Sequence, residues 1–384
     1  MMPDNEIPFN KPFIAGKELY YVAQAVTKGN LSGDGFYTQA CCRLLEETFN
    51  IPKVLLTPSC TASLEMSAIL CDLKEGDEVI MPSYTFVSTA SAFVREGARP
   101  IFVDIREDTL NIDENLIEQV ITEKTKAICV VHYAGVACEM DRISEIARKH
   151  NLILIEDAAQ GVNAFYKGRA LGSIGDLGCY SFHETKNFIC GEGGALCINN
   201  ERFRERAEII RDKGTNRQKF FRGQVDKYSW VDIGSSYVPS ELCAAFLFGQ
   251  LELLESITNK RRTLHESYQN LLKPLIGCEN FRIPAVPIHC QSNFHMFAVL
   301  LTSSDLRNQA LEYLQRNGIN AVFHYIPLHQ SDYARSLSVT PSLPVTEKLA
   351  SELLRLPFYH DLNLKLQTTV ATYLNDFLAN STDE

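Results

Sequence analysis

The chain has 384 residues, of which 45% are hydrophobic and 22% are charged, and its formal net charge is −10. A single hydrophobic core stops growing at roughly 250–300 residues, so this length predicts two domains. The acidic balance argues against nucleic-acid or membrane partners, and we find neither an apolar run of the roughly 18 residues that a membrane span needs nor a signal peptide.

Short apolar runs alternate with amphipathic stretches in the first part of the chain. Strands are predicted at residues 53–57, 78–81, 100–103, 126–131 and 151–155, and helices at about 61–73, 85–95 and 141–150. This alternation is typical of βαβ units and of a mostly parallel sheet. The strands are almost continuously apolar, which indicates that both faces of the sheet are covered.

The pattern changes after Asn199. Helices are predicted at 201–213, 239–257, 259–272 and 304–317, with a long basic loop at 214–230 and a strand at 296–301. We therefore predict a large α/β domain over residues 1–257 and a smaller α+β domain over residues 258–384.

Lys186 is the first candidate for chemistry. It lies between the apolar stretch 177–180 and the glycine-rich turn 191–194, and the strand at 151–155 leads to Asp157. Pyridoxal phosphate (PLP) needs a lysine for its Schiff base and a carboxylate that keeps its ring nitrogen protonated. Taken singly, the lysine could be a solvated surface charge and the aspartate a turn or a helix cap.

Two other segments follow strands in the same way. The helix that begins near Thr61 carries small residues that leave backbone N–H groups open to an anion, although an ordinary helix cap explains the motif equally well. Phe86 could lie flat on a planar ring or pack in the core. The histidines lack metal-binding spacing, so no metal is expected. The twelve cysteines form no CxxC pair and are expected to be reduced thiols in a cytoplasmic protein.

Basic residues are concentrated between Arg202 and Lys227, where nine Lys or Arg residues accompany four acidic ones. The segment could be a solvated helix face and loop, or it could bind a phosphorylated ligand. No Gly-x-Ser-x-Gly elbow, Walker A loop or GxGxxG motif after a strand is present, so hydrolase, nucleotide-triphosphatase and dinucleotide-dehydrogenase functions lose their usual support.

The order of Thr61-Ala62, Phe86, the run 157–160 and the run from Ser181 to Lys186 resembles the sugar-nucleotide aminotransferases of the DegT/StrS family, over almost the whole chain. The resemblance implies the α/β fold of PLP-dependent transferases of fold type I and a homodimer with shared active sites. It implies a Schiff base on Lys186, a ring-nitrogen contact for Asp157, a ring-hydroxyl contact for Gln160, stacking by Phe86, and phosphate contacts from Thr61, Ala62 and Ser181. Many relatives complete the phosphate site with a partner asparagine, for which Ser236 is the expected substitute here.

Four segments, 56–66, 131–141, 221–228 and 322–329, resemble the branch of that family that makes dTDP-4-amino-4,6-dideoxygalactose for bacterial surface polysaccharides such as enterobacterial common antigen or O-antigen. This implies that L-glutamate converts the cofactor to pyridoxamine phosphate, which then aminates C4 of dTDP-4-dehydro-6-deoxy-D-glucose. The expected substrate contacts are Lys213, Arg217, Arg222, His324, Tyr325 and His329.

Three alternatives stay open at this point. A sister aminotransferase could place the amine equatorially at C4 or act at C3. A PLP-dependent dehydratase of the same fold is disfavoured, because such enzymes replace the catalytic lysine with histidine. A protein of another class could bind sugar nucleotides on this fold without catalysis.

Overall fold

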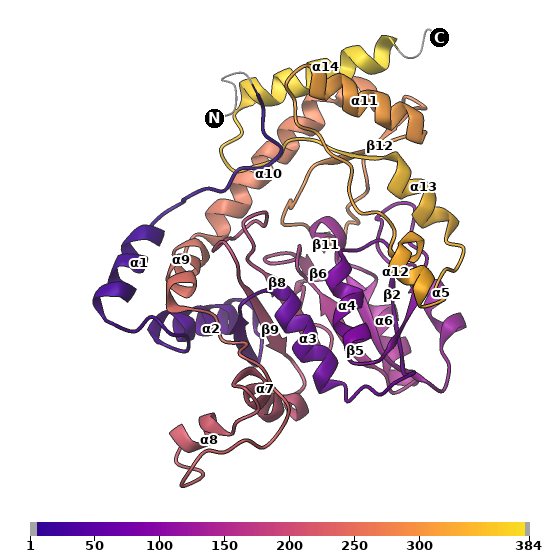
Figure 1. The fold of residues 1–384 in the computed structure, drawn as a ribbon. Coiled ribbons are helices and arrows are strands. Elements are labelled where there is room, and N and C mark those ends of the chain that lie inside the picture. The colour runs from indigo at the N-terminus through magenta and orange to yellow at the C-terminus, as the bar shows by residue number, and fades with distance from the viewer. Residues whose placement is uncertain (1–5, 381–384) are drawn as a thin grey trace.

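The computed structural model describes residues 6–380, and a seven-stranded sheet organises its larger part (Figure 1). The strand order is β1-β9-β8-β5-β4-β2-β3. The strands are β1 Lys53–Thr57, β2 Glu78–Pro82, β3 Arg99–Val103, β4 Thr125–Val131, β5 Ile153–Asp157, β8 Leu177–Ser181 and β9 Gly194–Ile198. Only β9 runs antiparallel to its neighbours in this sheet, so the predicted mostly parallel sheet is confirmed.

Helices cover both faces of this sheet. Side chains alternate between the two faces of a strand, so Val54 and Leu56 of β1 join one core while Leu55 joins the other. The first core includes α2 (Phe36–Phe49), α6 (Met140–Lys149) and α9 (Glu241–Leu251), and the second includes α3 (Cys60–Leu70), α4 (Val87–Arg95) and α7 (Arg204–Arg211). Burial on both faces explains why the strands are almost continuously apolar.

A smaller antiparallel sheet, in the order β10-β12-β13, lies near both ends of the chain (Figure 1). Its core contains residues of α10, α11 and α14 together with Ile7 from the N-terminal segment. The bounds are β10 Phe281–Arg282, β12 Ala298–Leu301, β13 Leu353–Arg355, α10 Leu254–Leu271, α11 Ser304–Arg316 and α14 Leu364–Asn380. Because Ile257 packs in a core of the large sheet and Leu264 in the small core, α10 joins the two cores. The domain boundary at residues 257/258 stays a prediction.

The remaining elements are short or peripheral. The third sheet contains β6 (Phe165–Tyr166), β7 (Arg169–Ala170) and β11 (Cys290–Gln291), and the other helices are α1 (Glu18–Thr27), α5 (Glu114–Ile117), α8 (Arg217–Phe221), α12 (Asp332–Ser336) and α13 (Pro344–Glu352). Within residues 6–380, no helix is long and apolar enough to cross a bilayer.

The structure corrects three predicted elements. The helix expected at 201–213 begins with a 3₁₀ turn, and α7 covers only Arg204–Arg211. The loop expected at 214–230 contains α8. The helix expected at 239–257 is interrupted, because Leu253 has non-helical dihedral angles (φ −113°, ψ 19°) between α9 and α10.

Candidate functional site

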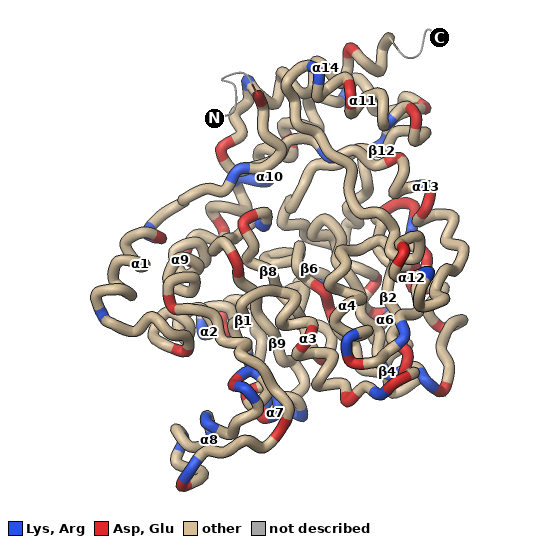
Figure 2. The backbone as a smooth tube through the Cα atoms, in the orientation of Figure 1, with Lys and Arg blue, Asp and Glu red and all other residues tan. Residues whose placement is uncertain are grey.

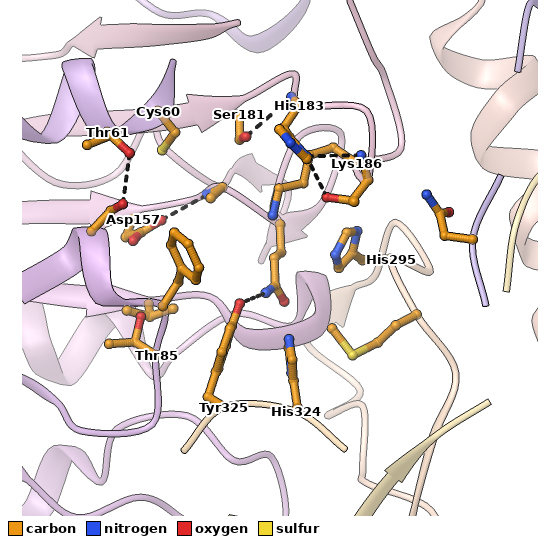
Figure 3. A pocket seen from close by; sticks show the side chains of 18 of the residues that line it. Cys60, Thr61, Thr85, Asp157, Ser181, His183, Lys186, His295, His324 and Tyr325 are labelled. Carbon is orange, nitrogen blue, oxygen red and sulfur yellow. Dashed lines mark hydrogen bonds between the residues drawn. The ribbon is translucent and has the colours of Figure 1, made fainter. Parts of the chain in front are cut away.

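A cavity of about 490 Å³ lies beyond the carboxyl ends of three neighbouring strands (Figure 3). Val131, Asp157 and Ser181 are the last residues of β4, β5 and β8, and all three line the cavity. Carboxyl ends of parallel strands meet at one edge of a sheet, where α/β proteins bind ligands. The small sheet closes another side of the cavity with Arg355 and the residues that follow it.

Lys186 reaches this cavity from the loop between β8 and β9 (Figure 3). Its backbone N–H donates to the carbonyl oxygen of His183 at 2.9 Å, which closes a tight turn. The side chain keeps some accessible surface because it lines the cavity, but surrounding protein desolvates the amine. This burial lowers the pKa of Lys186, and the nearby Cys60 and Asp157 oppose the decrease.

Asp157 is only 5% exposed and is held by two donors. The hydroxyl of Thr89 donates to its Oδ2 at 2.7 Å, and the N–H of Ala159 donates to its Oδ1 at 3.1 Å. Thr89 is in turn hydrogen-bonded to the hydroxyl of Thr85 at 2.7 Å. Burial raises the pKa of Asp157, whereas the two donors favour its charged form and lower that pKa.

The N-terminus of α3 supplies a polar wall of the cavity. Thr61 lines it, and the hydroxyl of Thr61 lies 2.8 Å from that of Ser88 on α4. Ser181 lines the same cavity from β8. Ala62 differs from the expectation: it does not line the cavity, and its N–H donates to the side chain of Ser59 at 3.1 Å. This wall therefore presents hydroxyl groups at the positive end of a helix dipole.

Gly194 explains why the start of α3 can lie so close to β9. A Cβ atom at this position would be 2.4 Å from the carbonyl carbon of Ser59 and 2.5 Å from the backbone nitrogen of Cys60. Only glycine permits this backbone approach without displacement.

The predicted ring contacts also gather at the cavity. Phe86 is 56% exposed, and its ring centroid lies 6.3 Å from that of Tyr325. Gln160 donates to the hydroxyl of Tyr325 at 2.8 Å and accepts from the N–H of Ala134 at 2.7 Å. The ring of His324 stacks on Tyr325 at 3.7 Å, and burial lowers the pKa of His324.

Besides Ala62, five predicted residues do not line this cavity: Lys213, Arg217, Arg222, Ser236 and His329. Figure 2 shows basic and acidic residues interspersed around α7 and α8. Lys213 and Arg217 lie 3.5 Å and 3.9 Å from the carboxylate of Asp212, and Arg222 pairs with Glu208 at 2.8 Å. His329 is buried and contacts Ser83 at 2.7 Å and Glu347 at 3.2 Å.

The structure adds cavity residues that the sequence analysis did not identify, chiefly Ser88, His295 and Arg355. Ser88 could have been found, because it lies two residues after Phe86 in the same predicted helix. His295 immediately precedes a predicted strand, and its Nδ1 lies 2.9 Å from Oδ1 of Asn187, next to Lys186. Nothing in the local sequence around Arg355 distinguishes it from a surface arginine.

Several known proteins resemble most of the chain. An uncharacterized protein of Methanocaldococcus jannaschii is 37% identical over 283 residues, which is 72% of this chain and 72% of that protein. The structure of the aminotransferase TlmJ from Streptoalloteichus hindustanus is 28% identical with a TM-score of 0.90, covering 98% of this chain and 99% of that one. Spr1654 of Streptococcus pneumoniae, a candidate sugar aminotransferase solved in its PMP form, is 26% identical with a TM-score of 0.89. The match covers 98% of this chain and 100% of that one.

These likenesses confirm the predicted fold type I architecture. A PLP form of Spr1654 has also been solved, so a relative carries the predicted cofactor on this fold. The family model for DegT/DnrJ/EryC1/StrS aminotransferases matches residues 12–375. The chain therefore belongs to the DegT/DnrJ/EryC1/StrS family of PLP-dependent sugar aminotransferases.

Proposed function

We propose that this chain transfers an amino group from L-glutamate to C4 of dTDP-4-dehydro-6-deoxy-D-glucose. The product is dTDP-4-amino-4,6-dideoxy-D-galactose, destined for a bacterial surface polysaccharide. The observation that carries the proposal is that one cavity combines Lys186, Asp157 and the hydroxyl-lined start of α3. The four segments 56–66, 131–141, 221–228 and 322–329 support this choice of substrate within the family.

The cavity residues fit pyridoxal phosphate. Thr61, Ser88 and Ser181 would hold the phosphate with their hydroxyl groups, and the helix dipole of α3 favours its charge. The N–H of Ala62 already has a partner in Ser59, so the hydroxyl groups are the better donors. When bound, the cofactor supplies an electron sink for the carbon that gains or loses the amino group.

Lys186 would act first as the covalent anchor and then as the proton carrier. Burial lowers its pKa, which increases the fraction of neutral amine at neutral pH. The neutral amine is the form that attacks a carbonyl carbon and accepts a proton. In the second stage Lys186 would deliver a proton to C4 of the sugar from one face, which makes the new amine axial. Such acid–base help contributes roughly 10²–10⁴-fold.

Asp157 would pair with the protonated ring nitrogen. The donors Thr89 and Ala159 orient its two oxygens and favour the ionised form that such a pair requires. Gln160 would contact the ring hydroxyl, and the exposed ring of Phe86 would stack on the cofactor. His324 and Tyr325 line the same cavity and would contact the sugar.

The nucleotide diphosphate would be held across a homodimer. Lys213, Arg217 and Arg222 project from the α7–α8 region and would serve the cavity of a partner subunit, where Ser236 would replace the phosphate-binding asparagine of many relatives. Exposed aromatic side chains support an interface near this region, since Trp230 is 81% exposed.

A cytoplasmic location belongs to the same proposal. All twelve cysteines are free, and nine of them are buried. Free thiols are the usual state in a reducing compartment.

One coupled assay tests the proposal. The holoenzyme is incubated with dTDP-4-dehydro-6-deoxy-D-glucose and L-glutamate, and the product is analysed by NMR. An axial amine at C4 is expected from the couplings of H4. An equatorial amine or an amine at C3 would support a sister aminotransferase, and no amination of any keto sugar tested would support a non-catalytic binding protein.

A further inference from the structure

His295 is held at the cavity by a strained and tightly bonded segment. Its neighbour Phe294 has a φ of 55°, a left-handed conformation that a non-glycine residue keeps only where surrounding contacts enforce it. Ser292 accepts from the N–H of Phe294 at 3.0 Å, and the buried guanidinium of Arg261 donates to the carbonyl oxygens of Phe294 and His295. These contacts place the ring of His295 in the cavity, where Figure 3 shows it, and backbone strain of this kind is typical of functional sites.

Asn187 determines which ring nitrogen of His295 carries the proton. Asn187 is only 3% exposed, and its Nδ2 donates to the carbonyl oxygen of Asn293 at 2.8 Å. Because a carbonyl oxygen only accepts, the amide has one possible orientation, and its Oδ1 faces Nδ1 of His295 at 2.9 Å. Within residues 6–380 no carboxylate pairs with this ring, and burial lowers the pKa of His295, so the ring is neutral. Nδ1 is therefore the nitrogen that donates, and Nε2 carries a lone pair without a proton.

The lone pair of Nε2 has no donor in the part of the chain that the structure describes. His295 is only 6% exposed, and no group among residues 6–380 donates to this nitrogen. Buried polar atoms are almost always hydrogen-bonded. His329, for comparison, is equally buried and has a partner at each ring nitrogen, Ser83 and Glu347. Since His295 lines the cavity, the donor that completes Nε2 comes with a ligand.

The chemistry of the two substrates indicates which ligand supplies this donor. The carboxylates of L-glutamate only accept hydrogen bonds, and its amine is the group that is transferred. The keto sugar instead carries hydroxyl groups, which donate. Lys186 lines the same cavity and acts at C4, and the hydroxyl on C3 is the one next to that carbon. A neutral acceptor in this cavity therefore fits the C3 hydroxyl better than any group of the amino-acid donor.

We propose that Asn187 fixes His295 as a hydrogen-bond acceptor for the C3 hydroxyl of the keto sugar. This inference rests on the proposed aminotransferase function. His295 is then a residue that determines specificity for the sugar, and Asn187 is a positioning residue that acts through it. A sugar without this hydroxyl is discriminated against, because Nε2 then stays desolvated and unpaired.

Nuclear magnetic resonance of the holoenzyme with ¹⁵N-labelled histidine tests the positioning role directly. The ring signals that disappear in His295→Phe should belong to a neutral imidazole with its proton on Nδ1. Asn187→Ala should lose this preference, because the partner of Nδ1 sets the tautomer. A wild-type ring with its proton on Nε2, or a tautomer that is unchanged in Asn187→Ala, would overturn the role of Asn187.

The two stages of the reaction are measured separately by following the cofactor absorbance in single turnover. His295→Phe keeps a planar ring but has no acceptor, so its sugar-nucleotide stage should be roughly 10- to 100-fold less efficient. The L-glutamate stage should stay near the wild-type rate. His295→Gln keeps an acceptor oxygen and should recover part of the loss. His360→Phe is the matched control, because His360 also has a ring nitrogen without a partner but does not line the cavity.

A substrate analogue identifies the hydroxyl without any change to the protein. The 3-deoxy form of the keto-sugar nucleotide should be used by the wild type roughly 10- to 100-fold less efficiently than the 3-hydroxy form. His295→Phe should use the two forms about equally well, because the partner of the hydroxyl is already missing.

Three results would overturn the assignment of His295: an unchanged sugar-nucleotide stage in His295→Phe, an equal loss in both stages, or a wild type that does not distinguish the two sugars. A wild-type holoenzyme that aminates no keto sugar would contradict the proposed function instead. The tautomer of His295 would still be measurable in that case, so the two failures are distinguishable.

Discussion

Asp157→Asn separates the catalytic role of the carboxylate from its structural role. Asparagine has the same shape, and its Oδ1 can accept from the N–H of Ala159 as the carboxylate does. Its Nδ2 would then donate to Thr89, whose hydroxyl can turn to donate to Thr85. The hydroxyl chain therefore reverses, and the fold should be kept.

The stability of the cofactor-free protein should rise slightly in this variant. Burial raises the pKa of Asp157 in the folded protein. The free energy of unfolding of the wild type therefore decreases as the pH rises from the ordinary value of 3.8 through the raised folded pKa, because the buried carboxylate must then be charged. Asp157→Asn lacks this loss. Its advantage over the wild type should appear across that window and then stay constant toward neutral pH, as measured by thermal unfolding between pH 4 and pH 8.

Turnover of Asp157→Asn should decrease, although the stability of the cofactor-free protein increases. Removing one partner of a buried ion pair costs roughly 3–5 kcal/mol, so turnover of Asp157→Asn should fall roughly 10²–10⁴-fold. Steady-state kinetics with the sugar nucleotide and L-glutamate measure this fall. Turnover equal to that of the wild type would refute the ring-nitrogen role, and a strongly destabilised variant would refute the reversal of the hydroxyl chain.

Three further predictions follow from the same geometry. Lys186→Ala should stay folded and still bind the cofactor noncovalently, but it should not turn over, as circular dichroism and steady-state kinetics will show. Neutralising Lys213, Arg217 and Arg222 together should raise the KM for the sugar nucleotide and reduce its dependence on salt, because these charges are proposed to hold the diphosphate. Gly194→Ala should lower the free energy of unfolding by roughly 1–3 kcal/mol, since the added methyl group meets the backbone at the start of α3; urea unfolding measures this.

Two control variants test whether removing any lysine, or any three paired basic residues, has the same effects. Lys167→Ala removes an exposed lysine outside the cavity and should leave turnover unchanged. Neutralising Arg142, Lys149 and Lys167 removes three charges that are also paired with carboxylates, but on and near α6. An unchanged KM for the sugar nucleotide in the variant that lacks the charges of Lys213, Arg217 and Arg222 would show that this segment is a solvated surface that does not bind the diphosphate.

The sequence predicted the part of the site that is built from strand ends. Asp157 and Ser181 end neighbouring parallel strands, and Thr61 and Phe86 follow two more, so the topology of the sheet brings them together. The prediction of β1 to β5 succeeded because both faces of the sheet are buried, which makes the apolar runs continuous, whereas β8 and β9 were not predicted as strands.

The remainder depends on contacts that no local pattern encodes. Arg355 reaches the cavity only because the small sheet folds against the large one, about half the chain away from the strands it meets. The break at Leu253 and the helix α8 within a basic segment were likewise not indicated by the local pattern of residues. The proposed diphosphate contacts of Lys213 and Arg222 would depend on a second subunit.

The most direct test of the account is to reduce the holoenzyme with borohydride and map its peptides by mass spectrometry. A pyridoxyl adduct on Lys186 is expected. An adduct on another lysine, or none on a preparation that is loaded with the cofactor, would contradict it.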